Sequence, residues 1–408
     1  MNPIDDVDEF DVVVVGGGPS GATAAKELAA QGLSVLLLDR GGRIKPCGGA
    51  IPPVLIEEFR IPGHLLVARI KLARAISPSK QQVDMPIEGG YVGMVDRETF
   101  DEWLRQRAVS VGAHRRTGTF VRLDRDADGK ARVVFEMDGA TRSQRSVRAN
   151  AVIGADGARS EVARQSIPGA ERMPFVAAYH EIIRSPGFAA SDTAVGSSPD
   201  FDKSRCDIYY DGRLSPDFYA WVFPHGETTS VGVGSARKGF SLRKATTALR
   251  QEAGFDGSET VRREGAPIPL KVLPRWDNGR DVILAGDAAG VVAPASGEGI
   301  YYAMLSGRMV AESVLEYSRT GDSRHLQAAR RKFMKAHGKV FWVLGLMQRF
   351  WYANDKRRER FVSMCKDPDV QNLTWQAYMH KRLVRARPMA HVRIFFKDLA
   401  HLLGLVAP

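Results

Sequence analysis

The stretch DVVVVGGGPSG, residues 11–21, decides the fold of this 408-residue chain. Its β-branched run, residues 11–15, predicts a short buried strand. Residues 19–31 are rich in Ala, Lys, Glu and Leu and predict a helix, and the apolar run 33–38 predicts a second strand. Because strand, crossover helix and strand form a parallel unit covered on both faces, the N-terminus predicts a parallel α/β sheet.

The glycines of this stretch follow the spacing GxGxxG, and each has a separate role. Gly16 allows a tight turn, Gly18 lets the backbone approach a pyrophosphate, and Gly21 lets helix and strand pack closely. The helix N-terminus supplies oriented N–H groups and a positive dipole to the anion. Asp39, at the end of the second strand, can accept hydrogen bonds from both ribose hydroxyls and would repel a 2′-phosphate. The motif predicts a dinucleotide site, with a purely structural glycine turn as the alternative, and by itself does not separate FAD from NAD.

Two later segments favour FAD. VIGADGARS, residues 152–160, and VILAGDAAG, residues 282–290, are each an apolar strand that ends in a Gly/Asp turn. The Asp287 carboxylate can bind a ribityl or pyrophosphate hydroxyl. The run SGEGI, residues 296–300, opens the next predicted helix and can present N–H groups to a flavin ring.

The remaining pattern predicts a mixed α/β (α+β) fold. It combines a Rossmann-like FAD-binding domain, an antiparallel-sheet substrate domain and a helical, basic C-terminal region. Strands are expected at 119–123, 132–137, 151–153, 177–183, 206–210, 219–223 and 230–233, and helices after Ile300. The expected domain boundaries are 1–75, 95–172 and 275–325 for the FAD-binding domain, 76–94 and 173–274 for the substrate domain, and 326–408 for the C-terminal region.

The net charge of +11 is concentrated near the C-terminus. Arg330 to Lys397 holds 17 Lys and Arg against four acids, a balance of 17 − 4 = +13. Aromatic residues typical of a membrane interface lie among these charges: Phe341, Trp342, Phe350, Trp351 and Tyr352. The pattern predicts an anionic membrane surface as partner, with a solvated helical face as the alternative. Nucleic acid is not expected, because no zinc-finger, RNP or helix-turn-helix signature is visible.

The cysteine spacing and the N-terminal sequence indicate the cellular compartment of the protein. Cys47, Cys206 and Cys365 are far apart and show no CxxC spacing, so we expect a reducing, cytoplasmic setting. Neither the cysteines nor the histidines show metal-ligand spacing, so we expect no metal site. The opening MNPIDDVDEF is acidic and does not read as a secretory signal. The apolar run 340–352 is shorter than the roughly 20 residues of a membrane-spanning helix.

The order of these motifs resembles a known superfamily. GGGPSG (16–21), Asp96-Arg97, GADGARS (154–160) and GDAAG (286–290) are similar to the flavoproteins that include aromatic hydroxylases. KPCGGA (45–50), YAWVFP (219–224) and GEGI (297–300) resemble the geranylgeranyl reductase family. The ending 383–406, with FFKDLAHLLGL, resembles its (bacterio)chlorophyll-pathway members, so the resemblance spans essentially the whole chain.

The resemblance implies stepwise saturation of three double bonds of a geranylgeranyl chain, as free diphosphate or as esterified pigment, to phytyl. It implies FAD as cofactor, NADPH as reductant and work beside the photosynthetic membrane in (bacterio)chlorophyll biosynthesis. Many relatives have Glu where this chain has Asp39. The cofactor-binding residues expected from motifs and resemblance together are Gly16, Gly18, Ser20, Gly21, Asp39, Arg40, Cys47, Gly48, Ala50, Arg97, Val121, Asp156, Gly286, Asp287, Gly297, Gly299 and Ile300.

The chemistry of that reaction singles out Cys47. An isolated alkene has no carbonyl to stabilise a carbanion, so a proton donor must act nearly in concert with hydride delivery. Cys47 is the candidate catalytic residue, with a small packed residue beside the flavin as the alternative. Tyr219, Trp221 and Phe223 alternate along one strand and are expected either to line an apolar tunnel for the substrate or to pack on the core.

Two other functions remain open from the sequence. The first is a flavin monooxygenase acting on an aromatic substrate. The second is a non-catalytic prenyl-binding protein on the same fold.

Overall fold

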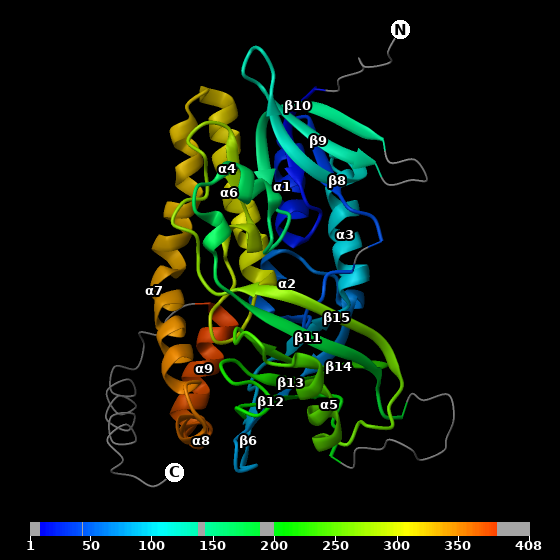
Figure 1. Ribbon diagram of the computed structural model, residues 1–408, viewed down its shortest axis with the longest axis vertical. Coiled ribbons are helices and arrows are strands. Elements are labelled where there is room, and N and C mark those ends of the chain that lie inside the picture. The colour runs from blue at the N-terminus through cyan, green and yellow to red at the C-terminus, as the bar shows by residue number, and fades with distance from the viewer. Residues whose placement is uncertain (1–8, 43, 138–142, 188–199, 382–408) are drawn as a thin grey trace. The chain divides into compact units, whose positions relative to one another are not determined.

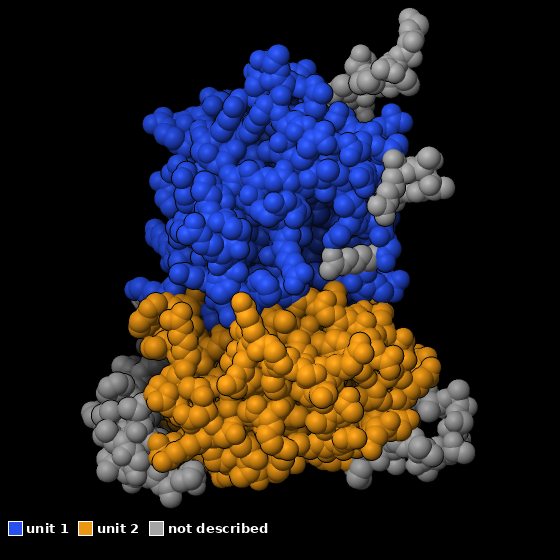
Figure 2. Space-filling view, viewed as in Figure 1, with its two compact units in different colours: residues 1–45, 97–175, 267–339 blue, residues 46–96, 176–266, 340–408 orange. Residues whose placement is uncertain are grey.

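The computed structural model describes residues 9–42, 44–137, 143–187 and 200–381 (Figure 1). The chain divides into two compact units, coloured separately in Figure 2. Unit 1 comprises residues 1–45, 97–175 and 267–339, and unit 2 comprises 46–96, 176–266 and 340–408. Each unit is therefore assembled from three separate stretches of sequence.

Unit 1 is built on a sheet whose core strands are parallel, as the N-terminal pattern predicts. The parallel strands run in the order β8, β2, β1, β10, β16, and β9 joins β8 to β10 in an antiparallel extension. The four valines of β1 are almost completely buried, as expected of a strand covered on both faces. The strands are β1 Glu9–Val15, β2 Val35–Asp39, β8 His114–Arg125, β9 Ala131–Met137, β10 Gln144–Gly154 and β16 Val282–Leu284.

Helices accompany this sheet, and α1 packs along α6. Gly307 of α6 makes the close approach possible, because a Cβ there would overlap the carbonyl oxygen of Ser20 in α1. The helices are α1 Pro19–Ala29, α3 Arg97–Val109, α4 Glu161–Ser166, α6 Ile300–Thr320 and the start of α7 Gln327–Trp351, with the 3₁₀ turns η2 Ala170–Arg172, η3 Gly286–Ala289 and η4 Ser323–Leu326.

Unit 2 contains a large, mainly antiparallel sheet with the strand order β15-β11-β14-β13-β12-β5-β6. The exception to the expected antiparallel layer is the β5–β12 pair, which is parallel. A smaller sheet has the order β3-β7-β4. The strands are β3 Ala50–Ile51, β4 Leu66–Ile70, β5 Leu72–Ile76, β6 Gln82–Pro86, β7 Val92–Val95, β11 Phe175–Arg184, β12 Arg205–Tyr209, β13 Ala220–His225, β14 Thr228–Ser235 and β15 Thr260–Pro269.

The two faces of the large sheet pack differently. Ala220 and Val222 point into a core with Leu249 of α5, whereas the other face carries an apolar cluster joined by Trp375 and Tyr378 of α9. The helices are α2 Pro53–Glu58, α5 Leu242–Glu252, α8 Asp355–Met364 and α9 Pro368–His380, with the turn η1 Gly63–Leu65.

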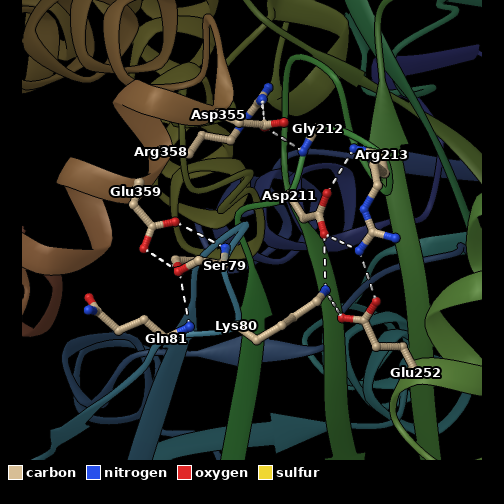
Figure 3. Close-up of polar contacts among 11 residues, drawn as sticks. Ser79, Lys80, Gln81, Asp211, Gly212, Arg213, Glu252, Asp355, Arg358 and Glu359 are labelled. Carbon is tan, nitrogen blue, oxygen red and sulfur yellow. Dashed lines mark hydrogen bonds and ion pairs between the residues drawn. The ribbon is translucent and has the colours of Figure 1, made fainter. Parts of the chain in front are cut away.

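Charged side chains of α8 form hydrogen bonds with the loops of the large sheet (Figure 3). Glu359 accepts hydrogen bonds from the hydroxyls of Ser77 and Ser79 at 2.8 and 2.7 Å. The buried Arg358 donates to the carbonyl of Tyr352. Nearby, Lys80 lies between Asp211 and Glu252. The helical region after residue 340 is therefore an integral part of unit 2.

The units divide the chain differently from the expected domains. Residues 46–75, expected in the FAD-binding domain, group with unit 2 because β3 and β4 pair with β7 and β5 pairs with β6. Residues 326–339 group with unit 1 because Phe333 packs on Trp276 and Tyr302. The rest of the expected C-terminal region falls in unit 2, and its ending, 382–408, lies outside the described residues.

No helix in the described part of the chain is both long and apolar enough to cross a membrane.

Candidate functional site

The carboxyl end of β1 is the topological switch point of the parallel sheet. β1 pairs with β2 on one side and with β10 on the other, so the chain order reverses there. Ligands of open α/β sheets bind outside the carboxyl ends of the strands at such a point. The glycine loop, residues 16–18, lies there, between β1 and α1.

The three motif glycines have different surroundings. Gly16 has a φ of +107°, and a Cβ there would overlap the carbonyl of Ala155. A Cβ on Gly21 would overlap the carbonyl oxygen of Gly16, so Gly21 allows α1 to pack on the loop. A Cβ on Gly18 would meet nothing within 4 Å. Gly16 and Gly21 are thus required by the fold, whereas the absence of a side chain at Gly18 leaves the backbone open to a ligand.

The N-termini of α1 and α6 both lack a capping side chain. The N-cap residues are Gly18 and Gly299, neither makes a side-chain cap, and neither helix has an acid in its first turn. Orphan N–H groups and the helix dipole at such ends suit an anion or a polar ring edge. A Cβ on Gly286 would overlap the Ser20 hydroxyl, so the turn after β16 packs directly on the start of α1. These residues fit the diphosphate of a dinucleotide.

Asp39 has a partner that the sequence did not suggest. Arg105 of α3 donates from Nη1 to Asp39 Oδ2 at 3.1 Å and to the carbonyl of Gly17 at 3.3 Å. A Cβ on Gly17 would stand 2.7 Å from Asp39 Oδ2, so Asp39 lies directly against the glycine loop. Arg105 therefore holds the predicted ribose-binding carboxylate against the loop, while the neighbouring Arg40 is exposed.

Asp287 also has an unforeseen partner. Lys45 Nζ lies 2.6 Å from Asp287 Oδ2, although the two residues are 242 positions apart. The Asp287 side chain is only 9% exposed and the Lys45 side chain 37% exposed. The pair places a cation beside the turn that follows β16. Gly297 has a φ of +66° in the loop leading to Ile300, the first residue of α6.

Asp156, Arg97 and Val121 make local contacts. Asp156 accepts hydrogen bonds from the Ser160 hydroxyl and the first backbone N–H groups of α4, and burial raises the pKa of its carboxyl group. Arg97 makes a two-point ion pair with Asp101, at 2.8 and 2.6 Å. The carbonyl of Val121 accepts from the side chain of Gln165. Their contact with a cofactor stays a prediction.

In unit 2 the segment PCGG, residues 46–49, packs against strand β13. A Cβ on Gly48 would stand 3.2 Å from the ring of Phe223, and one on Gly49 would stand 2.5 Å from Nε2 of His225. The backbone N–H of Gly49 lies 3.4 Å from Cys47 Sγ, and Ala50 begins β3. Cys47 is half-buried and makes no disulfide. Two of the three sequence motifs that carried the family resemblance, KPCGGA and YAWVFP, are therefore packed on each other.

Tyr219, Trp221 and Phe223 share one face, as predicted from their alternation. Their ring centroids are 5.9 and 6.2 Å apart in succession. Tyr219 comes just before β13, and both it and Phe223 are half-buried, whereas Trp221 is buried. The face therefore contains both packed and accessible aromatic surface, and a role in binding substrate stays a prediction.

Polar groups lie beneath this aromatic face. The indole N–H of Trp221 donates to Ser230 Oγ at 3.0 Å, and His180 Nδ1 lies 2.8 Å from the same oxygen. The other His180 nitrogen is 3.1 Å from Glu264 Oε2. Burial lowers the pKa of His225, which favours its neutral form. The sequence showed no metal-ligand spacing for these histidines and gave no indication of their place in the fold. Across the described residues, no cluster of His, Cys, Asp and Glu suits a metal ion.

Comparisons with known proteins agree with this geometry. A family model described as an FAD binding domain matches residues 64–336, and one described as an NAD(P)-binding Rossmann-like domain matches residues 14–61. The chain is 55% identical over 400 residues to geranylgeranyl diphosphate reductase from Rhodobacter capsulatus, covering 98% of this chain and 99% of the relative. The geranylgeranyl diphosphate reductase of Synechocystis is 35% identical over 408 residues, covering 96% and 97%.

A solved structure shows the same fold. It is a geranylgeranyl bacteriochlorophyll reductase-like protein from Thermoplasma acidophilum, with a TM-score of 0.77 and 22% identity, covering 94% of this chain and 100% of that chain. The predicted fold class, with its Rossmann-like FAD-binding domain of the aromatic-hydroxylase type, is confirmed.

Proposed function

The chain belongs to the geranylgeranyl diphosphate reductase family of FAD-binding oxidoreductases, and on this premise we propose that it saturates three double bonds of a geranylgeranyl chain to give phytyl. The observation that carries the proposal is the 55% identity to a reductase of this name over nearly the full length of both chains. The relatives come from photosynthetic organisms, which supports a role in (bacterio)chlorophyll biosynthesis.

Most of the residues expected to bind FAD lie in unit 1. The open backbone of Gly18 and the N–H groups that begin α1 and α6 would bind its anionic and polar parts. Asp39, held by Arg105, would accept hydrogen bonds from the ribose, and Asp287 from a further hydroxyl. When bound and reduced, FAD supplies the hydride.

The residues expected to act on the alkene lie on or next to β13 and in the PCGG segment. Tyr219, Trp221 and Phe223 present an apolar face that would hold the prenyl chain and exclude water. Cys47 would donate the Sγ proton to one alkene carbon while the other carbon receives the hydride, and the thiolate would regain a proton from solvent. The sum is two hydrogens added for each double bond.

NADPH is the proposed source of reducing equivalents, and a cytoplasmic site of action at the photosynthetic membrane is the proposed location. The match of residues 14–61 to an NAD(P)-binding Rossmann-like domain supports a nicotinamide reductant in general. Anaerobic stopped-flow reduction of the bound flavin by NADPH, NADH and reduced ferredoxin would rank the donors. Faster bleaching with NADH or ferredoxin would contradict the choice of NADPH.

The reaction is tested by incubating the reduced holoprotein anaerobically with geranylgeranyl diphosphate and, separately, with geranylgeranylated pigment. We expect successive mass increases of two hydrogens, ending after three additions. A monooxygenase would instead consume oxygen when its substrate is added, and a non-catalytic prenyl-binding protein would bind the chain without changing its mass. No mass gain with either substrate would refute the proposed reaction.

A further inference from the structure

One side of α7, the helix labelled in Figure 1, carries exposed residues along most of its length. At 3.6 residues per turn, positions spaced by three and four fall on the same side of a helix. The exposed residues of the stripe are Arg331, Lys335, Lys339, Trp342, Leu346 and Arg349. We call these six residues the α7 face.

The apolar centre of the α7 face is unusually exposed. Trp342 is 70% exposed and Leu346 is 54% exposed, the highest values for large apolar side chains within the described ranges. The two residues are four apart and therefore adjacent on the helix. Three other aromatic residues that were expected at a membrane interface, Phe341, Trp351 and Tyr352, are buried and cannot contact a membrane surface. Those three residues were wrongly predicted from the sequence alone to face a membrane.

The charge of α7 has one sign. Its 25 residues include six Lys and Arg and no Asp or Glu. Lys332 forms an ion pair with Glu312, whereas Lys335, Lys339 and Arg349 of the α7 face have no ion-pair partner among the described residues. Exposed cations therefore flank Trp342 and Leu346 on both sides.

We propose that the α7 face is a docking surface for a membrane that contains anionic lipid. Trp342 and Leu346 would enter the boundary between headgroups and acyl chains, and the four cations would contact lipid phosphates. This inference rests on the proposed function. A geranylgeranyl chain partitions into a bilayer, so a reductase bound to the membrane surface lies close to its substrate.

Two other occupants explain the α7 face less well. A second copy of the chain, docked by two-fold symmetry, would bring the same cations against each other, and two apolar side chains fall far short of the roughly 1,200 Å² of a stable interface. Nucleic acid would use the cations and could stack on Trp342, but would leave Leu346 without an apolar partner.

The test measures binding of the FAD-loaded full chain to sedimented vesicles of phosphatidylcholine alone or with 30% phosphatidylglycerol. We expect roughly tenfold tighter binding to the anionic vesicles. The double substitution Trp342→Ser/Leu346→Ser is expected to weaken that binding about tenfold, and Lys335→Glu/Lys339→Glu by at least as much. Val261→Ser on β15 and Lys238→Glu/Lys244→Glu are controls, exposed residues with the same changes of polarity and charge, and should bind like the parent.

Binding that is unchanged in both α7 double variants, or equal on neutral and anionic vesicles, would overturn the proposal. So would a dimer in sedimentation velocity that Trp342→Ser dissociates, or tighter binding to single-stranded DNA than to anionic vesicles. Reduction of geranylgeranyl diphosphate in detergent is measured in parallel and should be equal for all variants. If no variant, including the parent protein, reduces geranylgeranyl diphosphate in detergent, the proposed function is refuted. If the parent protein is active in detergent but does not bind anionic vesicles, only the docking proposal is refuted.

Discussion

The imidazole of His225 lies against the backbone of Gly49. A Cβ built on Gly49 would stand 2.5 Å from Nε2 of His225 and 2.6 Å from the carbonyl oxygen of Val95. His225 Nδ1 is itself 2.9 Å from the carbonyl oxygen of Phe223, in the same strand. The histidine thus joins the aromatic strand β13 to the turn that carries Cys47, and both parts of the proposed substrate side depend on this contact.

Gly49→Ala should destabilise the protein strongly. Gly49 has a φ of +70°, which strains an alanine, and the added methyl group would also collide with His225 and Val95. We expect a loss of about 3 kcal/mol in the free energy of unfolding by urea. Gly89→Ala is the matched control, because Gly89 also has a φ of +70° but has nothing within 4 Å of an added Cβ. It should lose only about 1 kcal/mol, and equal losses would contradict the collision.

Acidification should weaken unit 2 through His225. Burial lowers the pKa of His225 below its ordinary value of 6.5. The hydrogen bond with the Phe223 backbone and the charge of Asp96 oppose the shift, and His180 adds to it. Below pH 6.5 the unfolded chain therefore binds a proton that the folded chain does not, so stability falls as the pH drops. The slope for one such proton approaches about 1.4 kcal/mol per pH unit.

His225→Asn removes this titration and should flatten the dependence. The measurement is the urea midpoint of both proteins at intervals from pH 7.5 to 5.5. Glu102, whose pKa is lowered to about 2 chiefly by its hydrogen bond with Arg115, loses its contribution at lower pH, outside this window. Parallel curves for the two proteins would show that His225 does not titrate differently on folding.

The fold of unit 1 could be predicted because its signals are local. The apolar run of β1, the glycine spacing and the helix that follows are contiguous, and the structure places β1, α1 and β2 within a few residues of the predicted limits. The same holds for the shared face of Tyr219, Trp221 and Phe223, which follows from the two-residue period of a strand.

Contacts between distant residues could not be predicted. Arg105 and Asp39 are 66 positions apart and Lys45 and Asp287 are 242 apart, and no local pattern links such pairs. Whether an aromatic side chain of α7 is buried or exposed could not be predicted from the sequence either. Trp351 and Trp342 stand in the same basic segment, yet one is buried and the other exposed, because tertiary packing decides which side of α7 is covered.

Gly18→Ala and Gly21→Ala should separate cofactor binding from folding. Alanine at Gly21 would collide with the carbonyl oxygen of Gly16, so we expect little folded protein. Alanine at Gly18 meets no protein atom within 4 Å and has an ordinary φ of −72°, so the apoprotein should keep its stability. Its methyl group would stand in the space left for a ligand, and FAD affinity should fall at least about tenfold. Fluorescence titration with FAD and thermal unfolding check both expectations, and parental FAD affinity in Gly18→Ala would argue against the pyrophosphate at this loop.

Cys47→Ala should keep the flavin and lose most turnover. The side chain is half-buried and its sulfur accepts a long hydrogen bond from the Gly49 N–H, at 3.4 Å, so its loss should leave the fold intact. If the thiol is the proton donor, kcat should fall about 10² to 10⁴-fold, the usual contribution of general acid catalysis.

Cys206→Ala is the control for the Cys47 variant, because Cys206 is buried within the sheet and takes no part in the proposed chemistry. The measurements are the visible absorption spectrum for flavin content and anaerobic product formation for turnover. Cys47→Ser, which keeps a weaker proton donor of similar size, should retain more activity than Cys47→Ala. Normal turnover in Cys47→Ala, with full flavin content, would reduce Cys47 to a packing residue and require another proton donor.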